Sequence, residues 1–304
     1  MIGLKDKKEG FSSVYKILTD QKIYKIYNQV AFSKYFRDKL SKFKRLYDEL
    51  YKIKLSVKHK NEGFSSVYKI LTNQKIYKIY NHIAFSKYFR LRLIKFKKLY
   101  GELYKLKLSV NHKVIANRII EIEEIESDQE LSIKKLFNSE KLLKNFLKQI
   151  NKIGFINQNV SSKKIIHEIE NYTKNNSQHQ KIYKKINELK NYLNIYHQNK
   201  ICHGDLHLGN IIINKNRFFF LDWDYFLMSS YGYDLAMFAY LEKLSKKQIE
   251  KISLYSKVSL EEIYHYLPIC QLLDYLYLSL TYKKNNEVVK KLKLKVDKFI
   301  SSNL

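Results

Sequence analysis

ICHGDLHLGNIII at residues 201–213 and FFFLDWD at residues 218–224 are the stretches around which this chain is organised. Each pairs an apolar run with polar, carboxylate-bearing residues, which is typical of short buried strands beside a polar loop. Asp205 follows the first apolar run, Asn210 comes five residues later, and Asp222 ends the second run. These residue types suit phosphoryl transfer, because one Asp can orient a hydroxyl while an Asn and another Asp hold Mg²⁺.

Three motifs carry a resemblance to a known family, namely HGDLHLGN at 203–210, LDWD at 221–224 and DLA at 234–236. Their order and spacing are similar to those of the aminoglycoside phosphotransferase and choline kinase superfamily, whose members phosphorylate hydroxyl groups of small molecules. The well-matched region is roughly residues 195–240. The resemblance implies an α+β, bilobal, protein-kinase-like fold with a small β-rich N-lobe and a mostly helical C-lobe.

The resemblance also implies a role for each polar residue of the motifs. By its position, Asp205 is the general base that orients the acceptor hydroxyl, and His203 braces the loop through hydrogen bonds. Asn210 and Asp222 are the Mg²⁺ ligands, since both offer the hard oxygen donors that this cation prefers. For His207, two interpretations remain open: neutralisation of the transferring phosphoryl group, and packing of the loop.

The residues that follow Asp222 allow several interpretations. Asp224 is a candidate for a second metal site, for binding a cationic acceptor, or for a solvated turn. Asp234 is predicted to be structural, capping a helix and bracing the catalytic loop. Aromatic rings beside carboxylates can cage a quaternary ammonium group such as choline, and the candidates here are Trp223, Tyr225, Tyr231 and Tyr233.

The N-terminal third is a tandem repeat with a 53-residue period, in which 42 of 52 aligned positions are identical. Each copy combines an opening that contains a Gly and two Ser, two strands joined by a short turn, and a stretch of helical periodicity. The predicted domains are an extra copy of the N-lobe segment at 1–60, the N-lobe with its hinge at 61–127, and the helical C-lobe at 128–304 with the catalytic loop at 201–224.

In the second copy, a loop containing Gly63, Ser65 and Ser66 is predicted to cover the phosphates of ATP. The alternation of the next strand places Lys78 on an apolar face, as expected for a lysine that pairs with those phosphates. No Asp or Glu lies between Lys78 and Glu102, so Glu102 is the local candidate partner of this lysine. The alternative is that Glu102 is a surface charge among lysines.

The second copy is predicted to be the functional one. It continues without interruption into residues 114–127, which alternate like a strand pair with a turn at 117–118 and lead toward the hinge. The first copy is then an appendage that packs beside the lobe or mediates self-association.

Composition favours a cytoplasmic, generally basic protein. Lys and Arg outnumber Asp and Glu by 57 to 29, but the lysines are spread along the chain, which argues against a dedicated nucleic-acid site. Such a surface attracts anionic nucleotides. Cys202 and Cys270 form neither a disulfide framework nor a zinc spacing. The apolar stretch at 263–282 contains polar residues that are costly in lipid, so we expect a buried helix and no membrane insertion.

These features predict an ATP- and Mg²⁺-dependent phosphotransferase that acts on a hydroxyl group of a small molecule. A choline-like amino alcohol is slightly preferred, while aminoglycosides, sugars and vitamin alcohols stay open. A protein kinase is disfavoured, because only eleven residues separate Asp222 from Asp234 and no Ala-Pro-Glu follows. The remaining alternative is a non-enzyme, either an inactive kinase-like relic or a basic nucleic-acid-binding protein.

Overall fold

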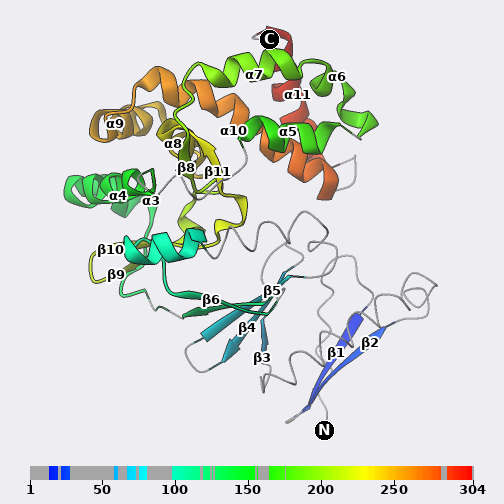
Figure 1. Cartoon of the computed structure of the whole chain (residues 1–304), viewed down its shortest axis with the longest axis vertical. Helices are drawn as coiled ribbons and strands as arrows, with labels where there is room; N and C mark the ends of the chain where they lie inside the picture. Colours follow the sequence, from blue (N-terminus) through cyan, green and yellow to red (C-terminus); the bar gives the residue numbers. More distant parts are fainter. Residues whose placement is uncertain are drawn as a thin grey trace. The chain divides into compact units, whose positions relative to one another are not determined.

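Figure 1 shows the computed structural model of the chain. It describes residues 14–19, 22–27, 58–60, 67–72, 75–80, 98–116, 119–123, 125, 127–154, 156, 164–174, 176–281 and 286–302. In the ranges before residue 98 it describes the strands but not their side chains. The three predicted domains stay a prediction.

The first of two compact units comprises Met1–Ser65 and Lys69–Asn73. Alternating residues on either side of a two-residue connection predict a hairpin in each copy of the repeat. In the first copy, β1 (Val14–Thr19) and β2 (Lys22–Tyr27) pair antiparallel as predicted. The short strand β3 (Lys58–Lys60) pairs antiparallel with β4 (Val67–Thr72).

The second unit comprises Ser66–Tyr68 and Gln74–Leu304, and it contains the strand of Lys78. This strand, β5 (Lys75–Tyr80), pairs antiparallel with β7 (Ile119–Glu123), where Lys78 lies opposite Ile120. On its other side β7 pairs with β6 (His112–Ala116), so the strand pair predicted at 114–127 is confirmed.

Helices make up most of the remaining described chain. Residues 98–105 are helical. The helices that follow are α3 (Ile133–Asn138), α4 (Glu140–Ile153), α5 (Ile165–Thr173), α6 (Gln180–Lys184), α7 (Ile186–Asn194), α8 (Tyr231–Leu241), α9 (Lys246–Ser256), α10 (Leu260–Thr281) and α11 (Glu287–Ser302). Helix α10 packs against α8, α9 and α11, and α4 packs against α9 (Figure 1). Helix α9 begins with a capping box between Ser245 and Gln248.

Two short antiparallel strand pairs lie among these helices and carry the predicted catalytic region. Strand β8 (Lys200–Cys202) pairs with β11 (Leu227–Ser229), and β9 (Ile211–Asn214) pairs with β10 (Arg217–Phe220). The β9–β10 connection has two central residues with positive φ, a geometry that suits a tight hairpin.

The core of the second unit is largely aromatic around β9 and β10. Alternation along β10 buries Phe218 and Phe220, and the ring of Phe218 packs 5.2 Å from that of Phe146 on α4. The ring of Phe146 also lies 5.1 Å from that of Phe238 on α8. This packing fixes the strand pair on which the candidate site is built.

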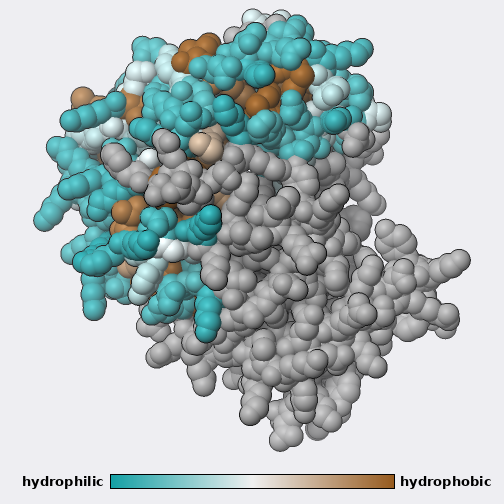
Figure 2. Space-filling model, in the orientation of Figure 1, coloured by the Kyte–Doolittle hydropathy of each residue, from teal (hydrophilic) through white to brown (hydrophobic). Residues whose placement is uncertain are grey.

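The described surface is mainly hydrophilic on the face shown in Figure 2, with hydrophobic side chains in small patches. Within the described ranges, none of the helices is long and apolar enough to span a membrane. The stretch considered as a span in the sequence lies in α10 and contributes fully buried residues to the core, including Ile263, Ile269 and Leu272.

Candidate active site

Strand pairing brings two loops together. The first, loop 203–210, runs from the end of β8 to the start of β9, and the second, loop 221–226, runs from the end of β10 to the start of β11. Because Phe220 pairs with Ile211 and Leu227 with Cys202, both ends of the two loops are held in register. Loop 203–210 contains Asp205 and Asn210, and loop 221–226 contains Asp222.

His203 joins the two loops. The backbone amide of Asp205, two residues further along the loop, donates a hydrogen bond to the Nδ1 atom of His203 at 3.3 Å. Because Nδ1 is thereby an acceptor, Nε2 carries the proton and donates to the carbonyl oxygen of Leu221 at 2.7 Å. His203 is fully buried and its ring packs 4.5 Å from that of Trp223. The predicted bracing contacts of His203 are therefore present.

Asp234 holds the beginning of loop 203–210. Its carboxylate accepts hydrogen bonds from the amides of His203 at 2.8 Å and Gly204 at 3.1 Å. Burial raises the pKa of Asp234 to about 6, although the two amide hydrogen bonds act to lower it. The predicted bracing of the loop is confirmed, whereas the prediction that this residue caps a helix is wrong, since it lies in the first turn of α8 and both oxygens bind the loop.

The backbone conformation at position 204 and the close approach of Tyr225 require a glycine there. Its φ of +83° lies in the left-handed region, and a Cβ atom here would lie 2.1 Å from the carbonyl oxygen of Tyr225. Loop 203–210 therefore passes against loop 221–226 at a separation that only glycine permits.

Asn210 is bonded to Asp205. Its Nδ2 atom donates to the backbone oxygen of Asp205 at 2.9 Å and to the carboxylate Oδ2 at 3.3 Å. The backbone oxygen of Asn210 accepts from the Leu221 amide at 2.8 Å. The backbone of Asn210 is thus bonded to the residue before Asp222, and its side-chain amide is turned toward the predicted base.

His207 serves the turn that ends loop 203–210. Its Nδ1 atom accepts a hydrogen bond from the Gly209 amide at 3.1 Å, which favours a proton on Nε2. The Nε2 atom lies 3.9 Å from Oδ2 of Asp205, beyond hydrogen-bond distance. The geometry accommodates both open interpretations, since the ring binds its own loop and faces the predicted base.

The acidic residues of loop 221–226 act electrostatically on Asp205. Burial, together with the negative charges of Asp222 and Asp224, raises the pKa of Asp205, while His207 and Asn210 lower it. Asp222 has φ 59° and ψ 60°, a left-handed conformation that is uncommon outside glycine. A bend of this kind between β10 and the next turn is a candidate for functional strain.

The aromatic cage considered from the sequence needs correction. Trp223 and Tyr233 are fully buried, and Tyr231 is 7% exposed with its hydroxyl donating to the Leu147 carbonyl. Their rings belong to the core, because the turn after Asp222 and the start of α8 both pack inward. Tyr225 is partly exposed and makes an edge-to-face contact with Tyr277 of α10 at 5.9 Å.

Tyr172 and Asp224 complete this neighbourhood. Burial raises the pKa of Tyr225, and the neighbouring Tyr277, Tyr172 and Asp224 raise it further. Tyr172 and Tyr277 lie 53 and 52 residues from Tyr225 along the chain, so no local pattern associated them with the site. The only available signal was that both residues are tyrosines, a residue type that can contact a cationic ligand.

The predicted nucleotide-binding residues fall mostly beyond what is described. Gly63, Ser65 and Ser66 lie outside the described residues, as does the side chain of Lys78. Glu102 lies in the helical stretch 98–105 and forms an ion pair with Lys105 at 2.8 Å. Its pairing with Lys78 stays a prediction.

Sequence reasoning missed Glu242, the residue that follows α8. Its carboxylate accepts the Leu208 amide of loop 203–210 at 2.7 Å. Glu242 lies outside every recognised motif, so local sequence offered no signal for this contact.

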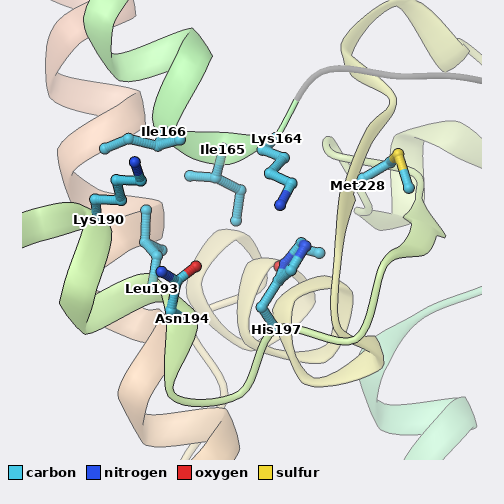
Figure 3. Close-up of a pocket in the computed structure, with 9 residues that line it drawn as sticks. Lys164, Ile165, Ile166, Lys190, Leu193, Asn194, His197 and Met228 are labelled. Atoms are coloured by element: carbon cyan, nitrogen blue, oxygen red, sulfur yellow. The ribbon is translucent and has the colours of Figure 1, made fainter.

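A separate pocket is shown in Figure 3 and contains none of the predicted site residues. Its polar lining includes Lys164, Lys190 and His197, on or beside α5 and α7, and Met228 borders it from β11. Among the described residues, no group of three or more His, Cys, Asp or Glu side chains could hold a metal ion.

Comparison with known proteins identifies the class of fold. The chain resembles the choline kinase LicA from Streptococcus pneumoniae with a TM-score of 0.66 and 18% identity, over 85% of this chain and 98% of that one. An ethanolamine kinase from Plasmodium vivax gives a TM-score of 0.61 and 14% identity, over 81% and 84% of the two chains. The streptomycin–ATP–APH(2″)-IIa ternary complex gives 0.55 and 15%, over 84% and 95%. The fold is that of small-molecule kinases.

The sequence comparison points to the same group. Residues 164–252 match the phosphotransferase enzyme family, abbreviated APH, and this segment includes both loops and Asp234. No curated protein sequence matches the chain. The resemblance to the aminoglycoside phosphotransferase and choline kinase superfamily, predicted from the three motifs, is therefore confirmed.

Proposed function

We propose that this protein is an ATP- and Mg²⁺-dependent phosphotransferase that phosphorylates a hydroxyl group of a small molecule. The observation that supports this most directly is the hydrogen-bonded arrangement of loops 203–210 and 221–226. In it Asp205 is hydrogen-bonded to Asn210, and Leu221, the residue before Asp222, is hydrogen-bonded to His203 and Asn210. Two Asp residues and an Asn are the residue types that phosphoryl transfer requires.

The donor set fits Mg²⁺. Asn210 and Asp222 offer an amide oxygen and a carboxylate, and Mg²⁺ is commonly held by one or two such ligands together with substrate phosphates. The negative charges of Asp222 and Asp224 repel the charge of Asp205, and a bound cation would offset this repulsion. When bound, the ion would neutralise charge on the β- and γ-phosphates.

Asp205 is the proposed general base. Its carboxylate accepts the Nδ2 hydrogen of Asn210, which fixes the direction of its oxygens. In the transfer, the acceptor oxygen bonds to the γ-phosphorus, the bond from this phosphorus to the β-bridging oxygen breaks, and ADP leaves. The acceptor proton passes to the Asp205 carboxylate, and the raised pKa of this group makes it a stronger base.

The nucleotide side is assigned to the second repeat copy. Lys78 lies on β5, whose partner β7 belongs to the same unit as the catalytic loops, whereas β1 and β2 form a separate two-stranded sheet in the other unit. Ser66 belongs to the unit of the catalytic loops as well, and Lys78 would pair with the phosphates, with Glu102 as the candidate partner of this lysine. That Gly63 and Ser65 cover the phosphates stays a prediction from the sequence.

A cationic amino alcohol such as choline is the preferred acceptor. Tyr225, Tyr277 and Tyr172 gather beside the buried carboxylate of Asp224, and rings with an adjacent negative charge attract quaternary ammonium groups. The structural similarity to a choline kinase and to an ethanolamine kinase supports the same preference. Similarity to a streptomycin complex keeps aminoglycosides as the second class to test.

The decisive experiment measures ADP release with ATP and Mg²⁺ against choline, ethanolamine, thiamine, simple sugars and aminoglycosides. Acceptor-dependent release that disappears in Asp205→Ala, but persists in a control Asp297→Ala on the distant surface of α11, supports the proposal and names the acceptor class. Asp297 pairs with Lys293 on that helix. Absence of both turnover and nucleotide binding overturns it and favours the nucleic-acid-binding alternative.

A further inference from the structure

Helix α8 contacts loop 203–210 through carboxylates at both of its ends. Asp234, in the first turn, accepts the amides of His203 and Gly204. Glu242, the C-cap residue of α8, accepts the amide of Leu208. Asp234 and Glu242 are eight residues apart, which corresponds to about 12 Å along a helix. The first acid holds the loop before Asp205, and the second holds it after Asp205.

The position of Glu242 does not serve helix stability. A carboxylate near a helix C-terminus is electrostatically unfavourable, because the carbonyl groups there carry partial negative charge. The chain ends α8 with Lys243 in a left-handed conformation, with φ 53°, although glycine is the residue usually found at such a site. Glu242 therefore occupies a position that the helix itself disfavours, while its carboxylate makes a short hydrogen bond to the neighbouring loop.

The contact controls the turn that presents Asn210. Residues Leu208–Asn210 form one 3-10 turn, and each amide of this turn has an acceptor. Gly209 donates to the His207 ring and Asn210 to the His207 carbonyl, both within loop 203–210. The Leu208 amide donates instead to Glu242, so this contact anchors the turn to α8.

We infer that Glu242 is a positioning residue for Asn210, acting through the Leu208 amide on the cation-binding turn. The inference rests on the proposed function, in which Asn210 is a Mg²⁺ ligand. Without the Glu242 acceptor, the turn keeps its internal hydrogen bonds but loses its attachment to α8. The Asn210 side chain would then be held less firmly in its ligating position, and the protein would need a higher cation concentration to bind the ion.

The test is calorimetric titration of the full chain with AMP-PNP, a non-transferable ATP analogue, over a series of Mg²⁺ concentrations. For Glu242→Ala we expect the Mg²⁺ concentration that gives half-maximal AMP-PNP binding to rise on the order of tenfold, the scale of one hydrogen bond to a charged group. Glu242→Gln keeps an oxygen acceptor and should stay within about threefold of the wild type. The matched control is Glu250→Ala, an exposed acid on α9.

A second measurement keeps the test independent of activity and of any folding defect. Amide hydrogen exchange at Leu208 should be faster in Glu242→Ala than in the wild type and unchanged in Glu242→Gln. Glu242→Asp keeps the charge but shortens the side chain, so it should resemble the alanine variant.

The outcomes separate the two levels of inference. An unchanged Mg²⁺ requirement in Glu242→Ala, or an equal loss of AMP-PNP affinity at every Mg²⁺ concentration, overturns the role of Glu242 alone. A wild-type chain that binds no AMP-PNP at any Mg²⁺ concentration overturns the proposed function, and the positioning role with it.

Discussion

The Nε2 atom of His203 lies 2.7 Å from the carbonyl oxygen of Leu221, so one buried imidazole connects the loop of the proposed base to the loop that contains Asp222, one of the two proposed metal ligands. The amide of the same Leu221 donates to the backbone oxygen of Asn210. Leu221 is therefore held on both sides by residues of the first loop, immediately before Asp222. Two hydrogen bonds, one from the His203 ring and one to the Asn210 backbone, thus hold the residue before Asp222 against the first loop.

Replacing His203 should disturb both loops at once. In His203→Ala, the Leu221 carbonyl and the Asp205 amide lose their partner, and a buried group left without one costs about 1–3 kcal/mol of unfolding free energy. Misplacement of the reacting groups should lower kcat roughly 100-fold. Urea denaturation and steady-state kinetics measure the two effects.

The matched control is His197→Ala, since His197 lies outside both loops and its ring is hydrogen-bonded to the nearby Asn199. Equal kinetic losses in the two histidine variants would argue against a specific role for the His203 contacts.

Gly204 should tolerate no side chain. In Gly204→Ala, the added Cβ would lie 2.1 Å from the backbone oxygen of Tyr225, and the positive φ would be strained as well. We expect a loss of about 2–5 kcal/mol in unfolding free energy, together with loss of phosphoryl transfer. Thermal denaturation and ADP release provide the measurements.

Gly101→Ala is the natural comparison for this variant. A Cβ at Gly101 would meet no atom within 4 Å, and alanine favours the helical conformation of that stretch by up to about 1 kcal/mol. It should leave stability unchanged or raise it, and a comparable loss in both variants would contradict the close-approach argument.

Much of the second unit was predictable because its signals are local. The apolar runs before Asp205 and Asp222 define short strands, and the alternating Phe218 and Phe220 define which side faces the core. The spacing of Asp205 and Asn210 depends on one loop, so their proximity follows from the sequence. The hairpin strands of each repeat follow from the same period-two pattern.

Contacts that depend on tertiary packing were not predictable in the same way. Glu242 reaches Leu208 only because α8 folds back over the loop, and Tyr277 meets Tyr225 only because α10 packs on α8. Trp223 was a plausible ligand contact by its neighbours in sequence, yet its indole donates to the Phe220 carbonyl and lies in the core. Sequence proximity to acids says little about the direction of a ring.

The ionisation of Asp234 should make folding stability depend on pH. Its folded pKa of about 6 is raised above the ordinary value of 3.8, so the charged form is disfavoured in the folded chain. The stabilising contribution of the protonated form is fully present below pH 3.8 and is lost as pH rises through 6. The integrated change is on the order of 3 kcal/mol.

Urea unfolding of the wild type and of Asp234→Asn between pH 4 and pH 7 isolates the contribution of Asp234 to the unfolding free energy, because other titrating groups act similarly in both proteins. The asparagine side chain, like the protonated carboxyl, offers one carbonyl oxygen to the loop amides, so the two proteins should have similar stability at pH 4, and the wild type should fall below the variant as pH rises through 6. Parallel stability curves for the two proteins would contradict the assigned pKa shift.

The Tyr277 ring should contribute to recognition of a cationic acceptor. It contacts Tyr225 edge-on beside Asp224, and loss of one cation–π contact corresponds to about a 3- to 30-fold change in affinity. In Tyr277→Ala the KM for choline should rise by that factor with the KM for ATP unchanged, whereas Tyr277→Phe keeps the ring and should retain most of the affinity. Tyr264→Ala, at a 37%-exposed position on the same helix, controls for general effects on α10. An equal rise in both KM values for Tyr277→Ala would place its effect in the fold of the lobe rather than in acceptor recognition.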